Sequence, residues 1–202
     1  EKLEDDKGKT PASIEKFNCL YQGDPISAEG LMYSKFKTYR EPPIAHEKKN
    51  YTDTADAGAD YLCSLSYIVN NGYFYITGAV YTDEDMEETE ETVPQMLIRT
   101  DTKKADIESN NGGRAFARQI QKAVVGKCKV DWFFQGANKE SRIKTNQPLV
   151  EEHIIWPEGW PVLYKHTTRY KKLFKANKQD GAPDVLTGII EKNQQRRRRI
   201  RG

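Results

Sequence analysis

Two parts of the chain differ in their pattern of apolar and polar residues. Residues 1–44 are polar, contain several Pro and Gly residues, and show short aromatic islands without a sustained period. We expect them to form an arm or linker rather than a core. Three strand-like runs follow, "YTDTA", "DYLCSLSYIV" and "YFYITGAVY", and Asn70-Asn71-Gly72 between the last two tolerate the positive φ of a hairpin turn. This pattern predicts three antiparallel strands.

The next part of the chain alternates between helix-like and strand-like segments. Two predicted helices, "EETEETVPQMLIR" and "GGRAFARQIQKAVV", are each followed by a strand-like run, "ADIES" and "KCKVDWFF". The apolar faces comprise Val93, Met96 and Leu97 in the first helix, and Phe116, Ile120 and Val124 in the second. Gly112-Gly113 predicts a tight turn from strand to helix.

The C-terminal part of the chain is predicted to be mainly helical. Pro148 interrupts the segment "RIKTNQPLVEEHI", so we expect a break there. The segments "PVLYKHTTRYKKLF" and "APDVLTGIIEKNQQ" predict two further helices, and the second is expected to bury Val185, Leu186, Ile189 and Ile190. The tail "QQRRRRIRG" is basic, and we expect disorder at its end.

The element order β-β-β-α-β-α-β-α predicts an α/β fold with one mixed sheet flanked by helices. The first three strands pair antiparallel, whereas the later strands need helical crossovers and are expected to run parallel to the first. This order is typical of the ribonuclease H-like architecture. We therefore predict an arm or linker at residues 1–44, a ribonuclease H-like domain at residues 45–191 and a basic tail at residues 192–202.

Composition narrows the function classes. The chain has 202 residues, and its 32 Lys and Arg nearly balance its 30 Asp and Glu, but acids cluster at Asp83–Glu91 and bases gather after Lys139. The three cysteines have neither the number nor the spacing of a disulfide framework or a zinc site, which fits a reducing compartment. No apolar run approaches the roughly 20 residues of a membrane span, so we expect a soluble protein. No GxxxxGK[ST] motif occurs, so an ATPase is not expected in this segment.

Three carboxylates occupy positions that such a fold brings together. Asp53 lies on the first strand, Glu108 ends the strand "ADIES", and Asp184 lies in the first turn of the last helix. Strand ends and helix starts converge on one rim of an open α/β sheet. Converging carboxylates repel one another unless a cation intervenes, and Mg²⁺ or Mn²⁺ suits their hard oxygen ligands. We predict a metal site, in which two ions about 3.5–4 Å apart would support phosphodiester hydrolysis.

Each of these acids also has a purely structural interpretation. Asp53 can end the strand or form an Asx-turn with the following loop. Glu108 can be a solvated strand-end residue or a partner of Arg114. Asp184 follows a proline at a helix start, where the helix dipole favours an acid without any function. The joint placement of the three acids favours the metal site.

Four motifs, in their order and spacing, resemble one known family. They are "YTDTADAGADYLCSL", "ADIESNNGGRAFAR", "NKESRI" and "APDVLTGIIE", and the resemblance covers residues 45–190. These motifs are similar to those of the C-terminal nuclease domain of the terminase large subunit of tailed phages and prophages. The segment "LYQGDPISAEGLMYSKFKTY" resembles the lead-out from that family's ATPase motor. The resemblance implies a ribonuclease H-like endonuclease that cuts concatemeric double-stranded DNA during genome packaging.

The resemblance also implies which residues bind the metal. The family's three acidic ligands fall on Asp53, Glu108 and Asp184, and two ions, Mg²⁺ or Mn²⁺, are implied as cofactors. The third motif reads "QDGAPD" here, and Gly181 replaces a position that is commonly polar in the family. Asp180 is therefore an auxiliary ligand or a substitute for Asp184.

A nuclease for duplex DNA needs cations beside its acidic rim, because phosphate contacts supply most of the non-specific affinity. The candidates are Arg114 and Arg118, one turn apart on one helix, and Lys139, Arg142 and Lys144 in "NKESRIKT", which borders the active site in the family. The two helical arginines are alternatively a solvated face or ion-pair partners. The run Arg196–Arg199 can grip DNA or simply solubilise the chain.

Other polar residues near these motifs have less specific interpretations. Asp56 and Asp60 are expected in a loop. Asp83, after the third strand, is either a further metal ligand or part of a solvated helix entry. His153 and His166 flank an aromatic stretch and are expected in the core or on the surface rather than at the active site.

The resemblance implies partners and a location. The implied partners are double-stranded DNA, the portal protein, the small terminase subunit and the ATPase domain of the same full-length chain, without a membrane. The implied location is the host bacterial cytoplasm, transiently on the procapsid portal, and the isolated domain is expected to be monomeric. Two alternatives stay open: another nuclease on this fold, such as a junction resolvase or an RNA-cleaving enzyme, and a non-catalytic DNA or portal docking module.

Overall fold

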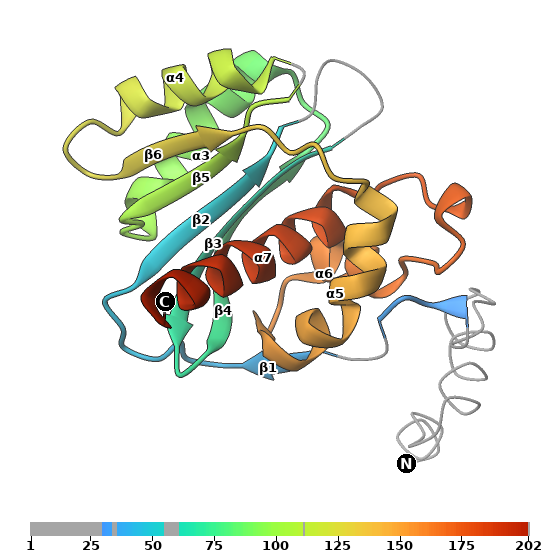
Figure 1. Ribbon diagram of the computed structural model, residues 1–202. Coiled ribbons are helices and arrows are strands. Elements are labelled where there is room, and N and C mark those ends of the chain that lie inside the picture. Colours follow the sequence, from blue (N-terminus) through green and yellow to red (C-terminus); the bar gives the residue numbers. More distant parts are fainter. Residues whose placement is uncertain (1–29, 34–35, 55–60, 111, 202) are drawn as a thin grey trace.

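The computed structural model describes residues 30–33, 36–54, 61–110 and 112–201. Within these ranges the chain forms one seven-stranded sheet in the order β1-β7-β4-β3-β2-β5-β6, with helices on both faces (Figure 1). The strands are β1 (Lys37–Tyr39), β2 (Lys48–Asp53), β3 (Leu62–Asn70), β4 (Tyr73–Thr82), β5 (Lys104–Glu108), β6 (Lys129–Phe133) and β7 (Ile154–Pro157). The helices are α3 (Met86–Arg99), α4 (Gly113–Ala123), α5 (Lys139–His153), α6 (Pro161–Thr168) and α7 (Gly181–Arg201), with a short 3₁₀ helix η2 (Phe174–Ala176).

Strands β2, β3 and β4 form the predicted antiparallel meander. Asn71 and Gly72 adopt φ angles of 50° and 84° between β3 and β4, which is the left-handed conformation that a tight hairpin turn needs. The first seven residues of β3 are all buried. This continuous burial arises because helices cover both faces of the sheet around its central strand.

Strands β5 and β6 extend the sheet beyond β2 in the predicted parallel direction. Helix α3 precedes β5, and helix α4 connects β5 to β6. Gly112 has a φ of 84°, and a Cβ on Gly113 would lie 2.3 Å from the carbonyl oxygen of Glu108. The two glycines therefore permit the immediate turn from β5 into α4. Parallel neighbours end at the same edge, so the carboxyl ends of β2 and β5 lie side by side.

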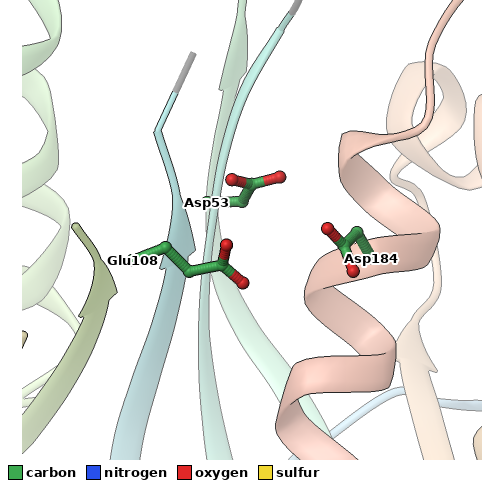
Figure 2. A group of neighbouring side chains, drawn as sticks. All are labelled: Asp53, Glu108 and Asp184. Carbon is green, nitrogen blue, oxygen red and sulfur yellow. The ribbon is translucent and has the colours of Figure 1, made fainter. Parts of the chain in front are cut away.

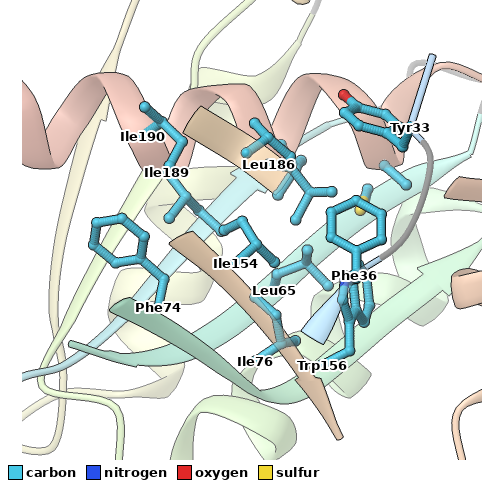
Figure 3. Close-up of a cluster of buried hydrophobic side chains, with 14 of the residues drawn as sticks. Tyr33, Phe36, Leu65, Phe74, Ile76, Ile154, Trp156, Leu186, Ile189 and Ile190 are labelled. Carbon is cyan, nitrogen blue, oxygen red and sulfur yellow. The ribbon is translucent and has the colours of Figure 1, made fainter. Parts of the chain in front are cut away.

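Two apolar layers hold the helices on the sheet. On one face, the predicted apolar residues of α3 and α4 pack against Ile107 and Val130. On the other face, α7 lies across β2 and β3 and packs beside α5 (Figure 1). Figure 3 shows Leu186, Ile189 and Ile190 of α7 facing apolar side chains of β3, β4 and β7. The spacing of apolar residues thus correctly predicted the buried faces of α3, α4 and α7.

Helix α7 approaches strand β2 most tightly at Gly188. A Cβ at this position would lie 2.1 Å from Cζ of Tyr51, so a larger residue would collide with the aromatic ring. Tyr51 is fully buried beneath the helix. The glycine therefore sets the separation between α7 and the sheet.

The described part of the predicted arm differs from expectation. Met32, Tyr33 and Phe36 are buried in the same layer as α7, and β1 pairs in parallel with β7 at the edge of the sheet. Sequence periodicity did not predict β1 or β7, because each is only three or four residues long and their pairing joins distant parts of the chain. Residues 1–29 lie outside the described residues.

Three C-terminal predictions also need correction. Pro148 lies inside α5 and does not end it, since the helix continues to His153. The helix predicted over "PVLYKHTTRYKKLF" ends at Thr168. The last predicted helix ended at Gln195, whereas α7 continues as far as Arg201, and Asn193, which was assigned to the basic tail, is buried. Among the described helices, none combines the length and apolar character needed to cross a membrane.

We predict that Gly188→Ala destabilises the fold by about 1–3 kcal/mol, which is the usual cost of overpacking a buried site. The added methyl group would force the Tyr51 ring away from α7. Urea denaturation measures the change in the free energy of unfolding. Gly30→Ala is the matched control, because a Cβ at Gly30 meets no atom within 4 Å. Equal stability of the two variants would contradict the proposed tight contact.

Candidate metal centre

Three carboxylates meet where β2, β5 and α7 converge. Asp53 ends β2, Glu108 ends β5, and Asp184 lies in the first turn of α7. One carboxylate oxygen from each residue lies within 4.8 Å of the other two. Figure 2 shows the two strand residues pointing across the gap towards the helical one. The fold therefore brings together the three acids that the sequence analysis selected.

Two neighbouring side chains fix the orientation of Glu108 and Asp184. The hydroxyl of Tyr51 donates a hydrogen bond of 2.6 Å to Oε1 of Glu108. Nη1 of Arg142 donates a hydrogen bond of 2.8 Å to Oδ1 of Asp184. The same guanidinium also contacts Glu191 at 2.9–3.3 Å, so it is held from two sides. One oxygen of each acid is thus anchored, and the second can serve another partner.

Lys139 brings a positive charge directly into the carboxylate cluster. Its Nζ lies 3.4 Å from Oδ2 of Asp53, 3.1 Å from Oδ1 of Asp180 and 3.2 Å from Oδ2 of Asp184. The lysine is the first residue of α5, and Asn138 caps that helix by accepting a hydrogen bond from the Ser141 amide. The start of α5 therefore positions the ammonium group.

Burial and mutual repulsion keep the carboxylates from ionising freely. Burial raises the pKa of Asp53 from 3.8 to about 6, although the nearby Lys139 opposes this shift. Burial, followed by the charges of Asp53 and Asp184, raises the pKa of Glu108 from 4.5 to about 7. Burial also raises the pKa of Asp184. For Lys139, burial lowers the pKa, but the surrounding carboxylates outweigh it and leave the pKa above its ordinary value, so the ammonium stays charged.

The donors fit a hard divalent cation. All three cluster residues offer carboxylate oxygens, which Mg²⁺ and Mn²⁺ prefer. Oδ2 of Asp184 is buried and makes no hydrogen bond within the described structure, although the Lys139 ammonium lies 3.2 Å away. A buried carboxylate oxygen without a hydrogen bond is costly, and a metal ion would compensate it. Asp53, Glu108 and Asp184 are therefore the residues that could hold metal.

Other predicted acids and histidines lie outside the three-acid cluster. Asp180 sits beside the cluster with a side chain that is 42% exposed, and it reaches Lys139. Asp83 is exposed after β4. His153 stacks on Phe74, and His166 contacts the Tyr81 hydroxyl, in agreement with structural roles. Asp56 and Asp60 lie outside the described residues.

The predicted DNA-binding residues separate into exposed and buried groups. Arg114, Arg118 and Lys144 are exposed, and the described ion pairs do not join Arg114 to Glu108. Arg142 is only 6% exposed, and its guanidinium is engaged by acids on α7. Because the Arg142 side chain is buried and paired, it is poorly placed for the predicted DNA contact. Instead, it holds Asp184 in position. Sequence spacing could not reveal this, because the partners lie on different helices.

Sequence reasoning missed two residues that support the cluster. Tyr51 precedes Asp53 by two positions, so alternation along β2 directs both side chains to the same face of the sheet. Glu191 follows Asp184 by seven positions, or two helical turns, and therefore lies on the same side of α7. Both spacings can be seen in the sequence, but the roles of the two residues depend on partners in other parts of the fold, Glu108 for Tyr51 and Arg142 for Glu191.

A family model described as the ribonuclease H-like domain of the bacteriophage T7 terminase matches residues 52–155. This segment is more than half of the 202-residue chain. The chain belongs to this family of terminase ribonuclease H-like domains. Asp53 and Glu108 lie within the matched segment, whereas Asp184 lies beyond it. No curated protein sequence matches the chain.

Solved structures of terminases share the fold of this domain. The large terminase of the thermophilic bacteriophage D6E is 12% identical with a TM-score of 0.58, covering 81% of this chain and 45% of its own. The nuclease domain of the large terminase subunit gp2 of bacterial virus Sf6 is 12% identical with a TM-score of 0.51, covering 77% and 89%. The human cytomegalovirus terminase nuclease domain is 14% identical with a TM-score of 0.52, covering 71% and 82%. These likenesses confirm the predicted ribonuclease H-like fold, and the chain spans less than half of the D6E protein.

We predict that the stability of this terminase domain without metal falls as the pH rises from about 4 to 7. The folded state retains protons on Asp53 and Glu108 that the unfolded chain releases, because both pKa values are raised by folding. Added Mn²⁺ should stabilise the protein more at pH 8 than at pH 5.5, since metal ligands must be deprotonated. Urea denaturation at each pH measures both effects. The Asp53→Asn/Glu108→Gln variant should lose both, and an unchanged pH dependence in that variant would contradict the assignment.

We also predict that Lys139→Ala binds Mn²⁺ several-fold more tightly than the unmodified domain. The ammonium group lies within 3.4 Å of two cluster acids and therefore competes with a metal cation for the same oxygens. Isothermal titration calorimetry at pH 8 measures the affinity. Lys144→Ala, an exposed lysine on the same helix, is the matched control and should not change it. Weaker Mn²⁺ binding by Lys139→Ala would refute competition.

Proposed function

We propose that the chain is the metal-dependent endonuclease domain of a phage DNA-packaging terminase large subunit. Its proposed substrate is concatemeric double-stranded DNA, cut by two-metal-ion hydrolysis of the phosphodiester bond. The observation that carries the proposal is the meeting of three carboxylates from β2, β5 and α7 within 4.8 Å. Membership of the terminase family supports this assignment over other activities of the fold.

The three cluster acids would hold Mg²⁺ or Mn²⁺, with Asp180 as an auxiliary ligand at the edge. When bound, the ions supply charge that activates a water molecule and stabilises the leaving oxygen of a phosphodiester. Two similar structures support the metal: the cytomegalovirus domain was soaked with Mn, and a K428A mutant of the Sf6 domain was solved with manganese.

The residues around the cluster would position the reacting groups. Tyr51 holds Glu108 by a hydrogen bond, and Arg142 holds Asp184 by a charge-assisted one. Lys139 is 39% exposed, so its ammonium group can reach a phosphate oxygen as well as the acids. A phosphate that enters the cluster would thus meet a fixed cation from α5. Arg114, Arg118 and Lys144 would contact the DNA backbone farther out.

The proposed assembly follows from the length of the relatives. This chain covers 45% of the D6E large terminase, so we assign it the nuclease part of a longer protein that also carries an ATPase domain. The portal protein and the small terminase subunit are the proposed further partners. The proposed location is the host bacterial cytoplasm, with transient attachment to the portal of the procapsid, and the isolated domain is proposed to be monomeric.

We predict that Asp53→Asn lowers Mn²⁺-dependent cleavage of plasmid DNA by at least about 100-fold. Loss of one ligand removes several kcal/mol of charge stabilisation from the transition state. Gel assays of supercoiled plasmid measure the rate, and circular dichroism checks the fold. Asp83→Asn, an exposed acid outside the cluster, is the matched control and should cleave normally.

The same assay compares plasmid DNA with a four-way junction and an RNA–DNA hybrid. Preferential cutting of plasmid DNA supports the terminase assignment. Preference for the junction or the hybrid would instead indicate a resolvase or an RNA-cleaving enzyme. Full activity of Asp53→Asn would refute the metal-ligand role of that residue.

A further inference from the structure

A second charged feature lies at the opposite end of the strands that carry the carboxylates. Side chains on β5 alternate, so Ala105 and Ile107 enter the apolar layer beneath α3 and α4, while Lys104, Asp106 and Glu108 face the side of α7. On β2 the same alternation places Lys49 and Tyr51 on the α7 side, where Lys49 contacts Asn193. This polar face connects the metal centre to the amino ends of the strands.

A pocket of about 680 Å³ opens at the amino ends of β2 and β5. Five lysines line it, against the two acids Glu47 and Asp106, so its lining carries an excess of positive charge. The lysines are Lys48, Lys49, Lys103, Lys104 and Lys192. We name it the lysine pocket.

Contacts within the lysine pocket separate its structural lysines from those that can bind a ligand. Lys49 lies 2.6 Å from Glu47, and Lys104 lies 2.9 Å from Asp106, so these two neutralise the acids of the lining. Lys48 and Lys103 share Asp101, whose side chain is 58% exposed. Solvated ion pairs of this kind are weak, and a phosphate can replace them at little cost.

Lys192 extends the positive charge along helix α7. Its ammonium group lies over the ring of Phe133, 3.1 Å from the ring centroid. Phe133 ends β6 opposite Glu108, the last residue of β5. The Lys192 charge therefore lies on the side of the lysine pocket that faces the metal centre.

The lysine pocket and the metal centre share their supporting elements. On β2, four residue steps from Lys49 to Asp53, which share one face of the sheet, correspond to about 13 Å, and on α7, eight steps from Asp184 to Lys192 correspond to about 12 Å. Duplex DNA carries about one phosphate charge per 1.7 Å of its axis, and its major groove is about 12 Å wide. One duplex can therefore reach both places.

We propose that the lysine pocket binds the phosphate backbone of the DNA substrate at a distance from the bond that is cut. This inference rests on the proposed nuclease function. Lysines suit phosphate as point charges, and apart from Tyr67 the lining is polar or charged, unlike the apolar centre of a protein–protein interface. The pocket would add affinity and orient the duplex, while the carboxylates would act on the scissile phosphate.

The test measures duplex DNA binding by fluorescence anisotropy in EDTA, so that cleavage does not interfere. Lys103→Gln/Lys192→Gln should weaken binding about tenfold at 0.1 M salt and flatten the slope of log affinity against log salt by about 2, because each lost phosphate contact contributes about 0.9. Lys103→Arg/Lys192→Arg should keep the affinity. Lys122→Gln/Lys127→Gln, with the same loss of charge at exposed positions at the end of α4 and after it, should also keep it.

Three outcomes separate this inference from its alternatives. An unchanged affinity and salt slope in Lys103→Gln/Lys192→Gln would overturn it, even if the unmodified domain cuts DNA. A reduced slope supports it, even if no metal-dependent cutting is found, in which case the nuclease proposal fails alone. Binding of ATP that depends on these lysines, without any effect on DNA, would overturn it in favour of a free nucleotide.

Discussion

The close packing of helix α7 on strand β2 is the contact on which the candidate site depends. Because Gly188 has no side chain, the ring of Tyr51 fits beneath the helix and its hydroxyl reaches Glu108. The same approach brings Asp184 at the start of α7 opposite the carboxyl ends of β2 and β5. A wider separation would move Asp184 away from Asp53 and Glu108, which end neighbouring strands at one edge of the sheet. Apolar packing of the rest of α7 supplies the free energy that holds them together.

The free energy of apolar packing offsets the electrostatic cost of burying three acids close together. Three acids that are buried near one another have raised pKa values, so the metal-free site favours protonation or a nearby cation. Helix α5 supplies two such cations: Lys139 lies among the acids, and Arg142 joins Asp184 to Glu191. One helix therefore both compensates the charge and fixes the geometry. Its own position depends on its packing against α7.

Local patterns predicted the meander, the parallel strands and the buried faces of α3, α4 and α7, because these follow from residue spacing alone. The candidate acids could also be predicted from the sequence, since strand ends and helix starts of this fold meet at one rim. Properties that depend on partners distant in the sequence could not be predicted. In the sequence Tyr33 and Phe36 are isolated aromatic residues, and their burial became evident only from the structure, in which β1 pairs with β7. Arg142 was predicted to contact DNA, but in the structure it forms ion pairs with Asp184 and Glu191. Pro148 was expected to break the helix, but the tertiary packing of α5 outweighs this local preference, and the helix continues through it.

The position of β1 has a consequence for the order in which the chain can fold. Lys37 lies opposite Ile155, so the two residues must close a long loop before the edge of the sheet can form. The meander of β2, β3 and β4 needs only short-range pairing and can form early. During synthesis, the segment with Met32, Tyr33 and Phe36 emerges well before its partners and keeps its apolar side chains in water until β7 has left the ribosome.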